Sequence, residues 1–355
     1  MRAKRESHFI PVSFASLVLK VLVTATFVCI FKIWSTSLAF GQEVIELKYA
    51  DWNPPTLTVA QVNQAMLNRI TERTKGKVRF VTFFSETLLK MPEVYRGVQT
   101  GVADMAYFGL GIPGSPAELG RVLTLPFMGI TSVEMGTKAM SKLWTESPEL
   151  QAEFKGVKVF GFRAMPLEHL MFTNKLAKIP ADVRGQKILA VGLRIEYVKS
   201  LGAAPVAVGP GEWYLALERG LANGFYQHFA AAYNFKLLDI LKYYTILNIN
   251  TGFDCFAINE RTWSKLSPEV RSIILEEAER RAQEMIKADY GEESKGLEYA
   301  KQKGGVFYNP TQDEMKLWIS SAEPVHKEWI EKYEQRGLPA RKIYERAKAI
   351  IQSVK

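Results

Sequence analysis

Histidines, cysteines and glycine-rich motifs decide which chemistry the chain could perform. The 355 residues include four histidines and two cysteines, and none of them has the spacing of a zinc site or a dithiol motif. The sequence contains neither the G-x-S-x-G turn of a serine hydrolase nor the G-x-x-x-x-G-K-[ST] loop of a nucleotide-binding enzyme. We therefore expect no catalytic residue, no metal and no cofactor. A glycosidase pair of carboxylates need not be close in sequence, so that class stays open.

A loop at residues 109–114 matches the pattern G-x-G-x-x-G and follows an expected strand. A dinucleotide-binding fingerprint needs a helix that opens at the last glycine and holds the pyrophosphate at its N-terminus. Pro113 and Pro116 occupy that stretch. The acid required about 20 residues further on would be Glu134, which lies in an expected helix. The pattern favours a bent surface loop over a nucleotide site.

Aromatic side chains at the ends of expected strands are the strongest candidates for binding chemistry. The residues at three strand ends are Trp52, then Phe84 with Ser85, then Tyr107 with Phe108. Ligands of open α/β sheets lie beyond the carboxyl ends of the strands, so these residues could line a pocket. Core packing is the alternative for each aromatic taken alone. We expect Trp52 and Tyr107 to line the pocket, because both adjoin turn residues.

The elements that must position these residues alternate between strand and helix. Strands are expected at 46–50, 78–84 and 105–108 with helices between them, which is the order of a parallel sheet. The alternation restarts at residue 187, so we expect two α/β units. After residue 259 the chain is mainly helical, with helices expected at 267–303 (interrupted near Gly291), 311–335 and 339–351. These helices could brace two domains or pair two subunits, and we favour bracing.

Residues 1–41 have the pattern of a secretory signal, with a basic start, two apolar runs and small residues at 37–41. An uncleaved membrane anchor is the alternative. This segment carries five of the 46 basic and one of the 37 acidic residues, so the rest keeps an excess of only five basic residues. That excess is too modest and dispersed for a nucleic-acid binder. Cys255 then remains in an apolar run, which indicates a buried structural thiol.

Short motifs spread over nearly all of the chain after residue 41 resemble the solute-binding proteins of tripartite ATP-independent periplasmic (TRAP) transporters. Each motif is loose alone, but together, in this order and at these spacings, they are specific. The motifs lie at 52–55 (WNPP), 74–78 (TKGKV), 87–89 (TLL), 98–106 (VQTGVADMA), 125–127 (LPF), 181–188 (ADVRGQKI), 201–205 (LGAAP), 214–220 (YLALERG) with 223–224, and 258–259 with 262–269.

The resemblance implies an α/β, two-lobe periplasmic binding protein fold (type II-like), with mixed sheets flanked by helices and long C-terminal helices. The expected domains are lobe 1 (42–164 plus 250–290), lobe 2 (165–249) and C-terminal helices that brace both lobes (291–355). Chain crossovers near 162–166 and 248–253 would act as hinges. The implied function is capture of a small organic acid in the periplasm and its delivery to TRAP membrane permease subunits, without chemistry. We expect a monomer that binds no nucleic acid.

One departure from the family pattern concerns the ligand carboxylate. Many family members carry an arginine directly after the motif G-x-K-I, where its planar fork can make two charge-assisted bonds to a carboxylate. This chain has Leu189 there. The candidate substitutes are Arg163, His169 and Arg194, although Arg194 could equally be a solvated helix residue.

Gln227 and His228 complete the candidate ligand-binding set, because family members often place a polar contact at this point. We expect a ligand with an apolar or aromatic body and few charges, most simply a monocarboxylate. Two other functions stay open at this point. An extracytoplasmic α/β hydrolase-like enzyme would need a nucleophile and a base, which the sequence does not offer in motif form. A ligand-binding module of a sensor system would have the same sequence features as a transport receptor.

Overall fold

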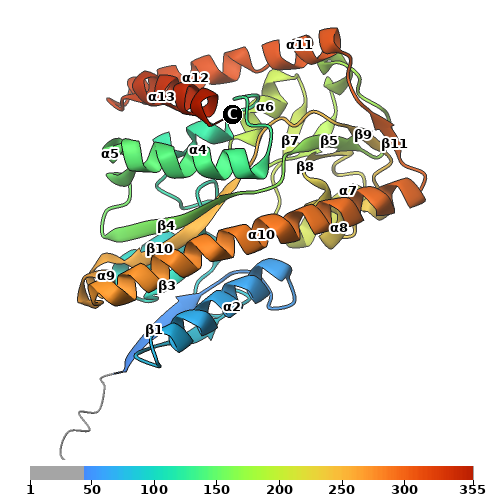
Figure 1. Ribbon diagram of the computed structural model, residues 1–355. Helices are drawn as coiled ribbons and strands as arrows, with labels where there is room; N and C mark the ends of the chain where they lie inside the picture. The colour runs from blue at the N-terminus through green and yellow to red at the C-terminus, as the bar shows by residue number, and fades with distance from the viewer. Residues whose placement is uncertain (1–43, 355) are drawn as a thin grey trace, which may run out of the picture. The chain divides into compact units, whose positions relative to one another are not determined.

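Two β-sheets and the helices around them make up the described part of the chain (Figure 1). The computed structural model describes residues 44–354, and the expected signal or anchor at 1–41 lies outside them. Within residues 44–354, no helix is both long and apolar enough to cross a membrane.

The first sheet has the strand order β2–β1–β3–β10–β4. Its strands are β1 (Ile45–Ala50), β2 (Val78–Phe83), β3 (Met105–Gly109), β4 (Val157–Ala164) and β10 (Phe253–Asn259). The parallel pairing of β1 with β3 confirms the expected alternation, while β10 runs antiparallel to both of its neighbours. The helices next to these strands in the chain are α2 (Thr58–Arg73), α3 (Val94–Thr100), α4 (Val133–Glu146), α5 (Pro148–Gln151) and α9 (Glu260–Lys265).

The second sheet has the strand order β11–β9–β5–β8–β6–β7. Its strands are β5 (His169–Phe172), β6 (Lys187–Leu189), β7 (Ala204–Val206), β8 (Gly224–Gln227), β9 (Tyr243–Thr245) and β11 (Val306–Tyr308). Its helices are α6 (Arg194–Ser200), α7 (Trp213–Glu218) and α8 (Phe229–Asn234). β5 is antiparallel to both of its neighbours, and β8, β6 and β7 are parallel to one another. Both sheets are therefore mixed.

The central strands of the first sheet are buried along their whole length. β3 and β10 consist almost entirely of apolar and aromatic residues, as expected for strands that are covered on both faces. Cys255 lies in β10 with 0% exposure, and burial raises the pKa of its thiol well above the usual value. This placement confirms the expected structural role of Cys255.

Helix α10 (Pro268–Gln302) begins where the sequence predicts. The Ser267 hydroxyl accepts a hydrogen bond from the Val270 amide at 3.3 Å, and Pro268 occupies the first turn. The expected interruption near Gly291 is wrong, because the helix continues through it. One glycine inside a helix costs only about 1 kcal/mol, and the contacts of the neighbouring turns outweigh that cost.

The same helix contacts β4 of the first sheet and α8, which follows β8 of the second sheet; its course is shown in Figure 1. A Cβ atom added to Gly161 of β4 would lie 2.9 Å from Cβ of Ala278, and one added to Gly296 would lie 2.8 Å from the carbonyl oxygen of Phe229 in α8. These two glycines therefore allow α10 to approach β4 and α8 closely.

The C-terminal helices differ from the expected pattern in one place. The expected helix at 311–335 is divided into α11 (Gln312–Ser320) and α12 (Glu323–Glu334). Pro324 lies in the first turn of α12, where its missing N–H and fixed φ are tolerated but would interrupt a continuous helix. Helix α13 (Ala340–Ser353) follows.

The chain passes between strands of the two sheets three times, once through α9 and α10, which connect β10 to β11, and twice through short crossovers, residues 165–168 after β4 and residues 246–252 before β10. The two short crossovers are hydrogen-bonded to each other. The Met165 amide donates to the Gly252 carbonyl oxygen, the Glu168 amide to that of Asn250, and the Ile249 amide to that of Glu168, each at 2.9 Å. The two crossovers therefore form a narrow two-stranded connection.

Strand direction determines which end of each sheet adjoins these crossovers. In the first sheet β4 ends there, and β1 and β3 run parallel to β4 because β3 and β4 are both antiparallel to β10. In the second sheet β5 begins there, and β6 and β8 end there. We call these ends the crossover edges. They carry the carboxyl ends of the parallel strands, where ligands of open α/β sheets bind.

Candidate functional site

Trp52 and Tyr107 lie against each other at the crossover edge of the first sheet. Their ring centroids are 4.6 Å apart and their planes are tilted by 48°. Tyr107, on β3, is only 3% exposed, whereas Trp52 follows β1 and is half-buried. The structure thus brings together the two aromatic residues that the sequence singled out, and Trp52 is the one that a ligand could reach.

A buried network of charged groups lies next to Tyr107. Its hydroxyl donates to Oδ2 of Asp254 at 2.7 Å, Nε of Arg163 donates to the same oxygen at 3.0 Å, and Nη1 of Arg281 donates to Oδ1 at 2.8 Å. Burial alone would raise the pKa of Asp254, but the two guanidiniums outweigh it and lower that pKa to about 2. Asp254 is therefore a buried anion that orients Tyr107.

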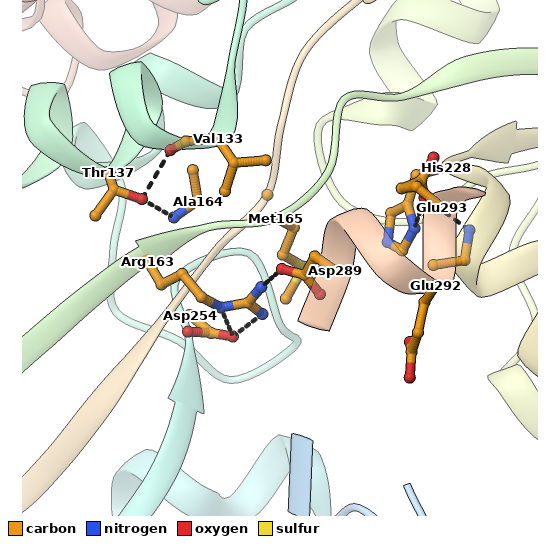
Figure 2. A network of polar contacts seen from close by, with 12 residues as sticks. Val133, Thr137, Arg163, Ala164, Met165, His228, Asp254, Asp289, Glu292 and Glu293 are labelled. Carbon is orange, nitrogen blue, oxygen red and sulfur yellow. Dashed lines mark hydrogen bonds and ion pairs between the residues drawn. The ribbon is translucent and has the colours of Figure 1, made fainter. Parts of the chain in front are cut away.

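Arg163 is occupied by carboxylates of the protein itself. It pairs with Asp254 and with Asp289 of α10, and its side chain is 3% exposed (Figure 2). Thr137 fixes this end of β4, because its hydroxyl accepts from the Ala164 amide at 2.9 Å and donates to the Val133 carbonyl oxygen at 2.8 Å. Arg163 does not reach into a crevice as anticipated, because a buried guanidinium needs anionic partners and finds them in β10 and α10.

The other candidates from the first sheet are separated from Tyr107. Phe108 is fully buried and packs against Phe154 and Tyr95 in the hydrophobic core. Successive side chains of a strand point to opposite faces, so Phe108 points away from the face that carries Tyr107. Phe84 is half-buried against Tyr49.

Ser85 is exposed, with its amide bonded to the Asn53 carbonyl oxygen at 3.1 Å. Its φ of 55° lies in the left-handed region. Ser85 thus stays near the first two strand ends and forms part of the turn after β2.

His169 and Gln227 are register partners at the crossover edge of the second sheet. His169 is 7% exposed, and its Nδ1 accepts from the amides of Leu247 and Asn248, each at 3.2 Å. Burial lowers the pKa of His169 to about 4. His169 is therefore a neutral acceptor that holds the second crossover, rather than a cation available to a ligand.

His228 follows Gln227 and caps α8, where its Nδ1 accepts from the Ala231 amide at 3.2 Å. The same nitrogen lies 3.1 Å from Oε1 of Glu293 in α10 (Figure 2). A nitrogen that accepts from an amide cannot also donate to a carboxylate, so the link between α8 and α10 is made by Glu293, which accepts from the amides of Phe229 at 3.3 Å and Ala230 at 2.7 Å.

A hollow of about 10 Å³, with room for about one water molecule, lies at the carboxyl ends of β6 and β8. Its lining is mostly apolar and aromatic: Leu189, Ala190, Val191, Arg194, Trp213, Phe225, Tyr226 and Gln227. Leu189 and Gln227, both members of the candidate set, thus share one hollow. Arg194 is the basic residue of this lining.

Arg194 is held in place by Glu168 of the first crossover. Nε donates to one carboxylate oxygen at 2.6 Å and Nη2 donates to the other, with 0% exposure for the Glu168 side chain and 17% for Arg194. Burial would lower the pKa of Arg194, but the Glu168 carboxylate outweighs it and raises that pKa. The alternative of a solvated helix residue does not hold for Arg194.

Sequence reasoning missed the acidic partners of these arginines. Asp254, Asp289 and Glu168 were not singled out, although Asp254 is the one charged residue of the mostly apolar β10 and a buried charge is paired as a rule. No local sequence pattern marked Trp213 and Tyr226 as residues that line the hollow. Residues 44–354 contain no group of three or more His, Cys, Asp or Glu that could hold a metal ion.

Comparisons with known proteins agree with this architecture. Residues 50–332 match the family model of bacterial extracellular solute-binding proteins, family 7. A solute-binding protein of Chromohalobacter salexigens is 22% identical over 79% of this chain and 84% of its own length.

Solved structures of TRAP solute-binding proteins share the fold. One from a marine metagenome, specific for aromatic acid ligands and bound to metahydroxyphenylacetate, has a TM-score of 0.79 at 20% identity, over 88% of this chain and 99% of its own. Another from Chromohalobacter salexigens, with bound D-glucuronate, has a TM-score of 0.75 at 19% identity, over 87% and 100%. These likenesses confirm the expected two-lobe fold with mixed sheets flanked by helices.

The family match extends over most of the chain and includes the motifs on which the resemblance was based. Relatives and structural neighbours are substrate-binding proteins, so the hydrolase alternative is not favoured. The chain belongs to family 7 of the bacterial extracellular solute-binding proteins, and it is a TRAP-type solute-binding receptor rather than an enzyme.

Proposed function

We propose that this receptor captures a monocarboxylate with an apolar or aromatic body between the crossover edges of its two sheets. The observation that carries this proposal is the pair of aromatic walls at those edges. Trp52 and Tyr107 stand on the first sheet, and the hollow that contains Trp213, Phe225 and Tyr226 opens on the second.

Contacts between the edges support a shared binding space. A Cβ atom added to Gly192, in the loop after β6, would lie 3.3 Å from the carbonyl oxygen of Gly111, in the loop after β3. The rings of Phe127 and Tyr197 also meet, with centroids 6.0 Å apart. A ligand held between these loops would be shielded from water on two sides.

The nature of the ligand follows from the charges at the two edges. Arg163 is already paired with the carboxylates of Asp254 and Asp289, and burial keeps His169 neutral. A ligand with several carboxylates would leave most of them without a cation, at a high desolvation cost. The aromatic acid and the uronate of the two structural neighbours each carry one carboxylate, in line with this proposal.

Ligand capture would close the two lobes about the paired crossovers. Lobe 1 would comprise 42–164 plus 250–290, lobe 2 would comprise 165–249, and residues 291–355 would brace both. Closure is a population shift, limited by the difference in ligand affinity between the open and closed states. The receptor would act as a monomer in the periplasm, after export directed by residues 1–41, and pass its ligand unchanged to TRAP membrane permease subunits.

A thermal-shift screen of organic acids tests this function. A ligand at 100 times its Kd stabilises the folded state by about 2.7 kcal/mol, so a monocarboxylate with an aromatic body should raise Tm clearly, and mass spectrometry should recover it unchanged. Solution scattering should show a smaller radius of gyration at saturation. Conversion of the bound acid, stabilisation by small dicarboxylates alone, or an unchanged radius would contradict the proposal.

A further inference from the structure

Building on the proposed function, we propose that Asp51 is a positioning residue that sets the orientation of the Trp52 ring toward the ligand. Asp51 lies between strand β1 and Trp52 and is only 1% exposed. A Cβ atom added to Gly109, at the end of β3, would lie 4.0 Å from Cη2 of Trp52. The ring therefore extends over the crossover edge, while the carboxylate beside it holds the backbone from inside.

The carboxylate of Asp51 closes the loop that carries Trp52. Its Oδ1 atom accepts from the backbone amide of Asn53 at 2.9 Å and from the side-chain amide of the same residue at 2.8 Å. This Asx turn spans Trp52 and fixes the backbone on both sides of the ring. The loop is also tied to the next strand end, because the Asp51 amide donates to the Phe83 carbonyl oxygen at 2.8 Å and the Ser85 amide donates to that of Asn53 at 3.1 Å.

The second carboxylate oxygen anchors this loop to the buried network of the first sheet. Oδ2 accepts from Nδ2 of Asn63 in α2 at 2.8 Å. The Oδ1 atom of Asn63 accepts in turn from Nε of Arg281 at 2.8 Å. Arg281 is bonded to Asp254, which accepts from the Tyr107 hydroxyl. One chain of hydrogen bonds therefore runs from the loop of Trp52 to the ring against which Trp52 packs.

The Asp51 carboxylate is held by uncharged groups. Within residues 44–354 it accepts four hydrogen bonds from Asn53, Asn63 and the Tyr49 hydroxyl, the last at 3.1 Å. Burial raises the pKa of Asp51, and these hydrogen bonds oppose that shift. A buried carboxyl group without an adjacent cation is costly, and carboxyl groups with shifted pKa values are concentrated at functional sites. The neighbouring group with a proposed function is Trp52.

A first measurement reads the orientation of Trp52 without any ligand. In the full chain labelled with 5-fluorotryptophan, the fluorine-19 resonance of Trp52 is the one that W52F removes. D51A should shift and broaden this resonance, because the loop loses both bonds that close its turn. The resonance of Trp263, assigned through W263F, should stay in place.

An exchange of side chains provides the rescue and replaces D51A if that variant does not fold. D51N sets its amide nitrogen against that of Asn63 and should move the Trp52 resonance. D51N/N63D exchanges the carboxylate and the amide between the two positions, so an acceptor remains for Asn53 and another for Arg281. This double variant should restore the wild-type resonance. A resonance that D51N moves and D51N/N63D does not restore would contradict the proposal.

A second measurement determines whether Asp51 acts on binding through Trp52. In calorimetric titration with benzoate, D51A should weaken binding by about three- to tenfold, up to the loss expected for W52A. In the W52A background the same substitution should change Kd by less than about twofold, because the effects of residues that act as a unit are not additive.

N259A is the matched control for a general loss of stability. Asn259 is 6% exposed and lies at the opposite end of β10, where its Nδ2 donates to the Val98 carbonyl oxygen at 2.8 Å. N259A should lower Tm but leave the Trp52 resonance and the Kd for benzoate unchanged.

The outcomes separate the role of Asp51 from the function of the receptor. If D51A leaves the Trp52 resonance unchanged, or if the losses of D51A and W52A in benzoate affinity add, the role of Asp51 is overturned while the receptor function stands. If the wild type binds neither benzoate nor any other monocarboxylate of a panel, the proposed function falls, whereas the resonance still reports whether Asp51 orients Trp52.

Discussion

The hydroxyl of Tyr107 donates to the carboxylate of Asp254 across the pair of strands β3 and β10, at 2.7 Å. The same carboxylate is bonded by Arg163 of β4 and Arg281 of α10. One buried anion therefore connects three strands and the long helix, and it orients the ring against which Trp52 packs. The position of the Trp52–Tyr107 pair therefore depends on the buried carboxylate of Asp254.

Substituting Asp254 by Asn should destabilise the protein strongly. The change leaves Arg163 and Arg281, both nearly fully buried, without their shared counter-ion, and breaking a buried ion pair from one side costs about 3–5 kcal/mol. Chemical denaturation should report this loss in the free energy of unfolding. The matched control is D313N, which removes a carboxylate with 89% exposure and should change stability by less than about 0.5 kcal/mol. Equal losses in the free energy of unfolding for the two variants would show that Asp254 does not stabilise the buried arginines.

The local order of elements was predictable from the sequence because it depends on short-range patterns. The first three strands and their helices follow from hydrophobic periodicity, and the start of α10 follows from Ser267 and Pro268. The placement of Trp52 beside Tyr107 follows from the rule that parallel strands end at one edge of a sheet. These inferences need no knowledge of which distant residues meet.

The ion pairs of the site were not predictable in the same way. Arg163 and Asp254 are 91 residues apart in the sequence, and Glu168 and Arg194 are 26 apart on different elements. No local pattern states which buried acid will meet which buried base, because partners are selected by tertiary packing. The one usable signal was a charged residue inside an apolar strand, as at Asp254, since such a residue must have a partner.

Replacing Trp52 by Ala should weaken ligand binding selectively. Of the two rings in the Trp52–Tyr107 pair, the half-buried Trp52 ring is the more exposed. Removing an aromatic contact of this kind costs about 1.5 kcal/mol, which is roughly a tenfold increase in Kd. The matched control is W263A, which removes another half-buried tryptophan, packed on Phe160 of β4 and on Arg271. Benzoate titration should show a weaker affinity for W52A alone. An unchanged Kd for W52A would remove this ring from the proposed site.

Removing the side chain of Asn250, in the second crossover, should lower the stability of the protein. Its amide nitrogen donates to the Thr124 carbonyl oxygen at 3.1 Å, and its Oδ1 accepts from the Tyr226 hydroxyl at 2.6 Å, so one side chain joins the first-sheet side to β8. N250A leaves both buried groups without a partner and should lower the free energy of unfolding by about 1–3 kcal/mol. The exposed Asn68 of α2 provides the control N68A, which should have little effect. A loss no larger than that of N68A would contradict this role.

His169 should make stability depend on pH in the window from about 4 to 6.5. Burial lowers the pKa of its imidazole from 6.5 to about 4 in the folded state, so within this window the unfolded chain binds a proton that the folded chain does not. Stability therefore rises with pH across the window and is lost as pH falls toward 4, with a contribution on the order of 3 kcal/mol. The cause is visible in the structure, because Nδ1 accepts from two backbone amides and a protonated ring would present an N–H to them.

The variant H169Q isolates this contribution. The Gln side-chain oxygen can still accept from the amides of Leu247 and Asn248, but it does not titrate, so the second crossover keeps an acceptor while the pH-dependent part disappears. Denaturation curves measured from pH 4 to 7 should give a difference between wild type and H169Q that changes across the window and becomes constant above pH 6.5. Parallel stability profiles would mean that His169 titrates normally in the folded state, and its assignment as a neutral acceptor at the crossover would have to be abandoned.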